Sequence, residues 1–150
     1  MTKQHEKKIA ISVLILLVLI QFIRIDKDNP VTPIENDFIE IYNPPTEIAT
    51  ILKTSCYDCH SNQVNYPWYT NVAPVSWVVK KHINEAREYF NFSDWSSQTA
   101  KRQDYILEEC AEEVEEGEMP LSSYLLMHSE AELTQIQIET LENYFKSLRK

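Results

Sequence analysis

Glycine is almost absent from this chain, since Gly117 is the only one among 150 residues. Tight β-hairpins depend on turn positions with φ > 0, which glycine adopts without steric cost. A β-rich fold would therefore lack the residue that its turns use most. Helices joined by loops of proline, asparagine and serine have no such requirement. The sequence predicts an all-α fold.

The N-terminal segment differs from the rest of the chain. Three lysines precede an uncharged run from Ile9 to Ile23, which Arg24 closes. A basic start followed by an apolar core is typical of a secretory signal. No small-residue cleavage site follows, so we predict an uncleaved transmembrane helix over residues 1–25, with a cleaved signal and a buried core helix as alternatives. Because basic residues stay inside, the rest would lie on the periplasmic side of the cytoplasmic membrane.

The remainder of the chain divides into a polar and a helical part. Residues 26–44 are polar and rich in proline, which favours an extracytoplasmic tether. Residues 45–150 carry apolar residues at helical spacing and are predicted to form the folded domain. Thr134 and Gln137 have the spacing of a capping box. Helices are expected from Pro45 into the motif described next, over 74–90, over 99–116 and from Thr134 onward.

The segment from Cys56 to His60 reads C-x-x-C-H. Two cysteines one helical turn apart can each form a thioether to a haem vinyl group, and the histidine that follows can ligate the iron. We therefore predict one covalently bound haem c held by Cys56, Cys59 and His60. A four-cysteine zinc site would need a second C-x-x-C, and a thioredoxin-like dithiol would need a βαβ unit. Cys110 is predicted to be a buried free thiol.

The second axial ligand of such a haem has three candidates in the sequence. Met119 precedes Pro120 in a loop after the Gly117 helix cap, where its thioether can turn inward. His82 lies on the apolar face of the predicted helix 74–90 and offers bis-histidine ligation instead. His128 is predicted to be exposed or a local cap. We favour Met119 for its place in the loop, with His82 as the alternative. The choice matters because the ligand pair sets the reduction potential.

Several longer strings of the sequence resemble a known family. They are the motif with its following Ser61-Asn62, then Tyr66-Pro67-Trp68-Tyr69, Ala73-Pro74-Val75-Ser76-Trp77, Asn91-Phe92-Ser93 and Gly117-Glu118-Met119-Pro120. The chain from about Pro44 to Lys150 is similar to the bacterial haem-binding domain family with a C-x-x-C-H motif. The resemblance implies a cytochrome c-like, membrane-tethered helical domain. It also implies that Met119 occupies the Met-Pro position of many small cytochromes c.

Aromatic residues follow the motif in the loop and at the start of the next helix. Trp68, Tyr69 and Trp77 are candidates to wall the haem, where they would exclude water and offer a donor to a propionate. Ordinary core packing is the equally weighted alternative for each of them. The sequence alone does not choose between the two roles.

The charge of the chain bears on its partners. Without residues 1–25, 10 basic residues stand against 22 acidic ones, a net charge of −12. Such a domain repels nucleic acid and favours redox partners with a basic docking face. No catalytic base or nucleophile is evident, so we predict a membrane-anchored electron carrier and not an enzyme. The alternatives are a haem-based sensor or gas-binding domain, and an accessory haem domain of a peroxidase-like system.

Overall fold

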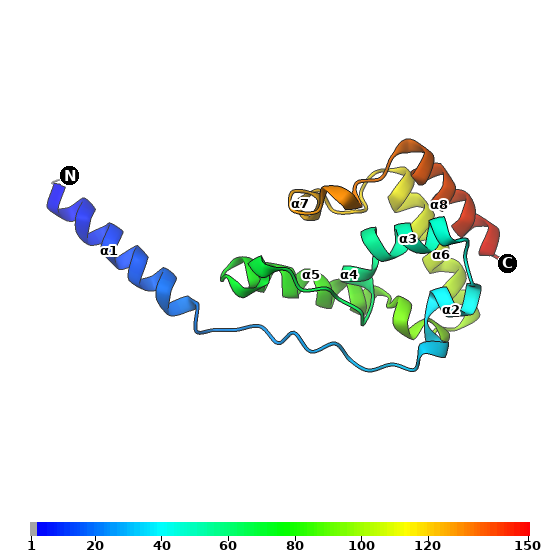
Figure 1. Cartoon of the computed structure of the whole chain (residues 1–150), viewed down its shortest axis with the longest axis horizontal. Coiled ribbons are helices and arrows are strands. Elements are labelled where there is room, and N and C mark those ends of the chain that lie inside the picture. Colours follow the sequence, from blue (N-terminus) through cyan, green and yellow to red (C-terminus); the bar gives the residue numbers. More distant parts are fainter. Residues whose placement is uncertain (1–2) are drawn as a thin grey trace.

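The computed structural model describes residues 3–150, and all regular secondary structure within them is helical (Figure 1). The predicted all-α fold is therefore confirmed. The helices are α1 (Lys3–Ile20), α2 (Phe38–Tyr42), α3 (Thr46–Ser55), α4 (Tyr57–His60), α5 (Val75–Tyr89), α6 (Ala100–Glu115), α7 (Ser122–Leu125) and α8 (Gln135–Leu148). Short 3₁₀ turns are η1 (Ile34–Asn36), η2 (Trp68–Asn71), η3 (Phe92–Ser97) and η4 (Ser129–Ala131).

The core lies where α6 and α8 pack along each other and meet α2, α3 and η3. It is built from large side chains that share almost complete burial, among them Phe38, Phe92, Trp95, Ile106, Leu107, Leu141 and Phe145. Aromatic rings interlock at its centre, with the Phe38 and Trp95 rings 4.9 Å apart and at 88°. Edge-to-face pairs of this kind add to the stability gained from burial alone.

Helix ends follow the signals in the sequence. Thr134 forms the predicted capping box with Gln137, which begins α8. Thr99 caps α6 by accepting from the Arg102 N–H. Gly117 follows α6 with φ +74, a left-handed conformation that glycine adopts without strain. These local signals place α6 and α8 at the predicted positions.

Helix α5 is less covered than its apolar pattern predicts. Ile83 is buried, but Val75 and Val78 of the same predicted inner face are 46 % and 53 % exposed. The helix packs on α4 and η2 and borders open cavities elsewhere. In Figure 1, α5 and α7 lie on the opposite side of the domain from α8.

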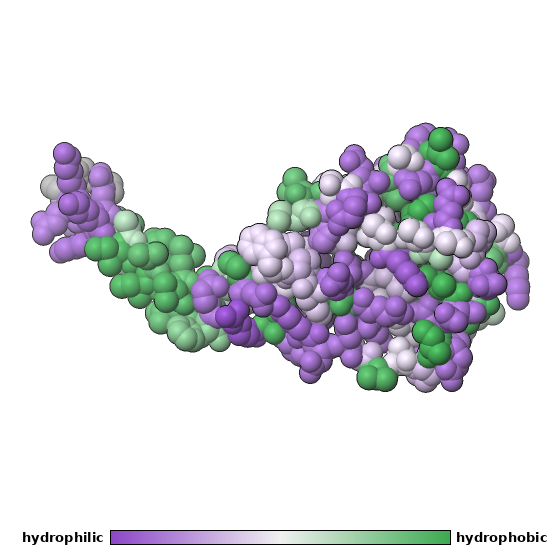
Figure 2. Space-filling view, viewed as in Figure 1, coloured by the Kyte–Doolittle hydropathy of each residue, from purple (hydrophilic) through white to green (hydrophobic). Residues whose placement is uncertain are grey.

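The N-terminal helix α1 corrects a prediction. Among the helices of residues 3–150, none combines the length and hydrophobicity that a membrane crossing requires. Helix α1 ends at Ile20, so its uncharged part from Ile9 is about 18 Å long at 1.5 Å per residue, against a hydrocarbon core of about 30 Å. The transmembrane helix predicted over residues 1–25, of which residues 1 and 2 lie outside the described part, is therefore unsupported, and the single-pass, periplasmic-side location derived from it is wrong. Figure 2 shows α1 as a hydrophobic rod with a hydrophilic N-terminal end.

The predicted tether over residues 26–44 contributes to the folded domain. Asp37 is the N-cap of α2, and the next residue, Phe38, is fully buried in the core. The packing thus begins before Pro45, where we expected the domain to start. The cause is a contact distant in sequence, between α2 and η3, which the polar composition of the segment does not reveal.

Candidate functional site

The C-x-x-C-H motif forms its own short helix. Helix α3 ends at Ser55, Cys56 leaves helical geometry with φ −124, and α4 then runs from Tyr57 to His60. The His60 N–H donates to the Cys56 carbonyl at 2.9 Å, which closes one turn around the motif. This turn brings Cys56, Cys59 and His60 to the wall of a common cavity.

Tyr57 anchors this turn to the core. Its hydroxyl donates to the Asp37 carboxylate at 2.8 Å, and its ring stacks on Phe92 at 5.2 Å and 10°. Asp37 is 3 % exposed and also accepts from Gln63 and Ser93. Burial, with the neighbouring carboxylate as a further cause, raises the pKa of Tyr57, so the phenol stays protonated. The motif is held in place from this side.

His60 faces the other way and has an unpartnered nitrogen. Its ring stacks on Phe90 at 4.2 Å and 15°, and no partner satisfies its buried Nδ1 atom. Burial lowers the pKa of His60 to about 4, against an opposing effect of the Phe90 and Ala86 backbone. The imidazole is therefore neutral near pH 7, the form in which histidine binds a metal.

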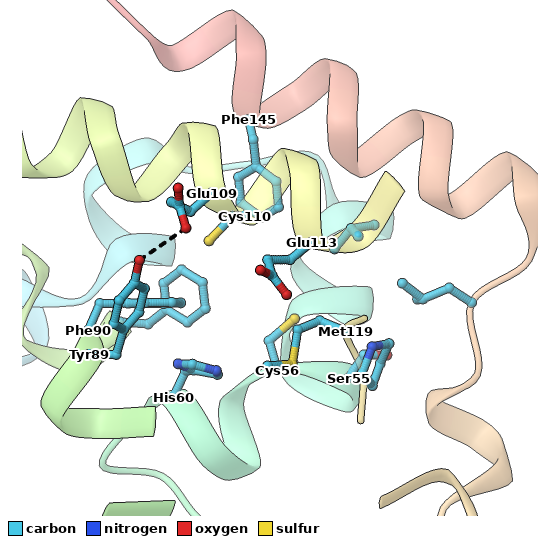
Figure 3. Close-up of a pocket in the computed structure, with 14 residues that line it drawn as sticks. Ser55, Cys56, His60, Tyr89, Phe90, Glu109, Cys110, Glu113, Met119 and Phe145 are labelled. Carbon is cyan, nitrogen blue, oxygen red and sulfur yellow. Dashed lines mark hydrogen bonds between the residues drawn. The ribbon is translucent and has the colours of Figure 1, made fainter. Parts of the chain in front are cut away.

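Two adjoining cavities, of about 320 and 260 Å³, open in front of His60. Cys56, His60 and Met119 line both of them, and Figure 3 shows these three around the larger one. From α6, Cys110 and Glu113 face them across the same space. The walls are mostly apolar, as in cavities that hold organic cofactors.

Met119 reaches this space from the loop after α6. Its backbone N–H donates to the Glu113 carbonyl at 3.1 Å, which turns the chain back over the helix end. The structure thus brings together four residues that the sequence analysis selected, namely Cys56, Cys59, His60 and Met119. Of these two cavities, His82 lines the smaller and not the larger.

His128 is placed elsewhere. Its Nε2 lies 2.6 Å from the Tyr69 hydroxyl and its Nδ1 lies 3.0 Å from Glu130, so both ring nitrogens are engaged. Its side chain is only 12 % exposed, so the predicted exposure is wrong. The predicted alternative, a local cap, is confirmed in position, because His128 is the N-cap residue of η4, without a capping bond from its side chain. The stacked ring of Tyr124, 4.2 Å away, covers it.

The three predicted wall aromatics do not border the cavities at His60. Trp68 and Tyr69 line a third cavity beside Cys59, and Trp68 is 71 % exposed. The Trp77 indole N–H donates to the Ile23 carbonyl at 3.0 Å, at the end of α1. The aromatic residues that do face His60 are Phe90 and Tyr89. Tyr89 is the last residue of α5 and Phe90 is its C-cap. In the sequence, the place of Phe90 on the apolar face of the predicted helix 74–90 was the one signal for this role.

The thiols of the motif are protonated. Burial raises the pKa of Cys56 to about 12 and that of Cys59 to about 11. Redox-active dithiols show the opposite shift. Cys110 is a free thiol whose pKa is also raised by burial, and it faces the cavity instead of being enclosed by side chains. Across residues 3–150, no cluster of three or more His, Cys, Asp or Glu side chains is arranged to hold a metal ion.

Comparison with known families decides the class of site. A family model described as a haem-binding domain matches residues 15–147, nearly the whole chain. The chain belongs to the haem-binding domain family. The matched region of this haem-binding domain includes the motif, the cavities and the Met119 loop. No curated protein and no solved structure was found to match it.

The residues of this haem-binding domain fit the cofactor. An apolar cavity takes a flat, largely hydrophobic ring, and one buried nitrogen of His60, Nδ1, has no hydrogen-bond partner within residues 3–150. His60 and Met119 supply the nitrogen and thioether that haem iron accepts. Sequence reasoning did not select Glu113 for this site, because its seven-glutamate segment reads as a solvated helix face.

Proposed function

We propose that this haem-binding domain is a c-type electron carrier with one covalently attached haem. The observation that carries the proposal is the buried, neutral imidazole of His60, which faces a cavity that Cys56 and Met119 also line and whose Nδ1 finds no hydrogen-bond partner within residues 3–150. When bound, the haem supplies an iron that takes up and releases one electron. The domain itself performs no substrate turnover in this proposal.

Cys56 and Cys59 hold the cofactor covalently. Each thiol adds across one vinyl group, the sulfur to one carbon and the hydrogen to the other, so no oxidant is required. Their spacing across one turn of α4 presents both sulfurs to the same cavity, the smaller of the two. Their anchor is Tyr57, whose bond to Asp37 keeps the turn from opening.

His60 and Met119 are the axial ligands in this proposal. Both line the two cavities in front of α4, whereas His82 lines one of them. The aromatic wall of Phe90 keeps the imidazole oriented and dry. A histidine–methionine pair raises the reduction potential relative to two histidines, which suits a carrier that accepts electrons readily.

The attachment is tested by producing the chain in cells that can attach haem c and extracting it with acidified acetone. Haem should stay with the wild type and with Cys110→Ala, whose thiol faces the same cavity. It should be extracted from the Cys56→Ala/Cys59→Ala double variant. Haem that is extracted equally from all three would show that the cofactor is not covalently bound.

The ligand pair is tested by absorption and potentiometry of the loaded protein. Met119→Ala should abolish the weak long-wavelength charge-transfer band of thioether-ligated ferric haem and lower the potential. His82→Ala and the surface control Ile136→Ala, at a residue 73 % exposed, should change neither. A band that survives in Met119→Ala contradicts the assignment, and a ferrous wild type that readily binds carbon monoxide favours a gas sensor.

The acidic surface supports a basic redox partner. The chain carries a formal net charge of −9, and seven glutamates lie between Glu108 and Glu118. Arg149 pairs with Glu108 and Lys146 lies near Glu115, but the carboxylates of Glu109 and Glu113 line the cavity of His60. Two carboxylates without a basic partner in these pairs thus lie beside the cofactor site. They steer a basic partner there and repel nucleic acid.

This docking preference can be measured with electrodes of opposite charge. Electron exchange should be faster at an amine-terminated monolayer than at a carboxylate-terminated one, and added salt should reduce the difference. Glu112→Lys/Glu116→Lys should weaken the preference more than Glu35→Lys/Glu40→Lys, which makes the same charge change on another surface. Equal rates at both electrodes would contradict a charge-steered partner.

A further inference from the structure

A third cavity, of about 500 Å³, lies beside Cys59 between α5 and α7. It shares Cys59, His82, Leu121 and Tyr124 with the smaller His60 cavity, but neither His60 nor Met119 lines it. Of the four residues that hold the haem in the proposed electron carrier, only Cys59 borders this space.

The wall of this cavity is apolar and open. Val75, Val78 and Val79 line it from α5, and Leu126 and Met127 line it from the end of α7. Leu126 is 83 % exposed and Met127 is 53 % exposed, although both are large hydrophobic side chains. Figure 2 shows hydrophobic residues gathered over α7 on this face. A small apolar molecule in the cavity would remove this surface from water.

One row of polar groups reaches the cavity. The Tyr69 hydroxyl lies 2.6 Å from His128 Nε2, and His128 Nδ1 lies 3.0 Å from the Glu130 carboxylate. Tyr69 and His128 line the cavity, whereas Glu130 lies outside, with its side chain 64 % exposed. The stacked Tyr124 ring fixes the imidazole, and the Tyr124 hydroxyl is itself bound to Asp58 at 2.9 Å.

The direction of the hydrogen bonds between Tyr69, His128 and Glu130 determines which ligand groups the Tyr69 hydroxyl can bind. A carboxylate only accepts, so His128 Nδ1 donates to Glu130, and in the neutral imidazole Nε2 then accepts from the Tyr69 hydroxyl. The Tyr69 oxygen then keeps a lone pair for one more donor. Burial raises the pKa of Tyr69, which keeps the phenol protonated. The cavity therefore offers a mostly apolar volume in which the Tyr69 hydroxyl is an available hydrogen-bond acceptor, beside the polar side chains of Asp58, Asn65, His82 and Ser123.

We propose that this cavity binds a small phenol, with the ring between the valines of α5 and the Leu126 and Met127 side chains at the end of α7, and with the hydroxyl donating to Tyr69. The chemistry follows from the pairing of a mostly apolar wall with a single oriented polar row, the pattern of small-molecule sites. The one carboxylate of this wall, Asp58, already accepts from the Asn65 N–H and the Tyr124 hydroxyl. A purely apolar ligand would leave the Tyr69 lone pair unused.

The binding test compares p-cresol with toluene, which has the same ring and methyl group but no hydroxyl. Calorimetry on the full chain without haem should show p-cresol binding about tenfold more tightly than toluene, the size of one net hydrogen bond. The Trp68 indole, at the cavity wall, should report both ligands by NMR. Absence of p-cresol binding, or equal affinity for the two ligands, overturns the proposal.

Variants locate the hydroxyl contact. Tyr69→Phe should bring p-cresol affinity to within about twofold of toluene affinity, while Tyr105→Phe, at an exposed tyrosine of α6, should leave the tenfold ratio intact. Met127→Ala should weaken both ligands by about two- to threefold, because it removes only apolar contact. A tenfold ratio that persists in Tyr69→Phe overturns the assigned orientation.

The haem-loaded protein separates this site from the cofactor site. p-Cresol should bind it with an affinity within about threefold of that measured without haem, because His60 and Met119 lie outside the cavity. Loss of p-cresol binding on haem loading would mean that the cofactor fills this space, which overturns the proposal. Binding without haem does not depend on the electron-carrier proposal, so either can fail alone.

Discussion

The two sides of α4 differ in how completely they are packed. On one side, Tyr57 enters a closed aromatic core and bonds to Asp37, whose carboxylate has four donors. On the other side, His60 faces cavities and its Nδ1 has no partner. The four-residue helix α4 therefore lies between a fully packed core on its Tyr57 side and open cavities on its His60 side.

This contrast explains how a cofactor site can exist before the cofactor arrives. Cavities in a core cost stability, and so do unpartnered buried polar atoms. The closed side of α4 supplies the packing that keeps the open side from collapsing. Substitutions on the two sides should consequently have opposite effects on the protein without haem, which the following predictions examine.

The largest effect is expected from Trp95→Ala on the closed side. Trp95 is fully buried, and its removal should lower the free energy of unfolding by about 3–5 kcal/mol. Urea denaturation followed by circular dichroism measures it. Trp68→Ala, at a largely exposed tryptophan, is the matched control and should cost less than about 1 kcal/mol. Similar losses from both would contradict the closed core.

Asp37→Ala should come next in size. It leaves the Tyr57 hydroxyl, the Ile39 N–H and the Gln63 amide without their acceptor, which should cost about 2–3 kcal/mol in the same measurement. Asp28→Ala, at an exposed aspartate, should cost less than about 0.5 kcal/mol. If Asp37→Ala is no worse than its control, the carboxylate is not what holds α4.

A cavity-filling change should act in the opposite direction. Cys110→Leu adds apolar volume to the space in front of His60, so the protein without haem should gain about 1 kcal/mol of stability. The same variant should take up less haem per chain, measured from the absorbance of the purified protein. Lower stability together with unchanged haem content would show that neither the new leucine side chain nor haem occupies this space.

The smallest effect is expected from Glu113→Gln. Burial, with neighbouring glutamates as a further cause, raises the pKa of Glu113, so the folded state binds its proton more tightly than the unfolded state. The stabilisation by this group is present below its unfolded pKa and is lost as pH rises through the folded one. The variant should therefore melt about 1–2 °C higher than wild type at pH 7, a shift kept small because the side chain is largely solvated.

The pH dependence supplies the control for this variant. The difference in melting temperature should shrink toward pH 4, where the wild-type carboxyl is itself protonated. A difference that stays constant from pH 4 to pH 7 would have another origin than ionisation of Glu113.

Local signals in the sequence predicted the parts of the fold that depend on neighbours along the chain. Thr134 with Gln137, and Gly117 after α6, act through hydrogen bonds within one turn, so the sequence contains the whole cause. The same holds for the single turn that brings Cys56 and Cys59 to one wall. The Met119 loop was predicted from its position after the helix cap, and the structure brings it to the cavity.

Contacts distant in sequence were beyond such reasoning. Phe38 enters the core because α2 meets η3, and Trp77 turns toward Ile23 because α1 ends beside α5. The anchor predicted from the apolar run near the N-terminus is unsupported because its helix stops at Ile20, three residues before the apolar composition ends. The sequence analysis did not select Glu113, because it lies among seven glutamates that are typical of a solvated helix face. Its position opposite His60 depends on a contact distant in sequence.

The junction between α1 and the domain has a mechanical consequence. Gln21 bonds to both the N–H and the carbonyl of Ala73, at 2.9 and 3.0 Å, and Arg24 reaches the Asn71 carbonyl. Because these bonds lie side by side across the same joint, a pull on the N-terminal helix loads them together. Tension would therefore reach η2 and its Tyr69 before it extends the linker that follows. The cavity between α5 and α7, which Tyr69 lines, would be the first part of the domain to deform under force.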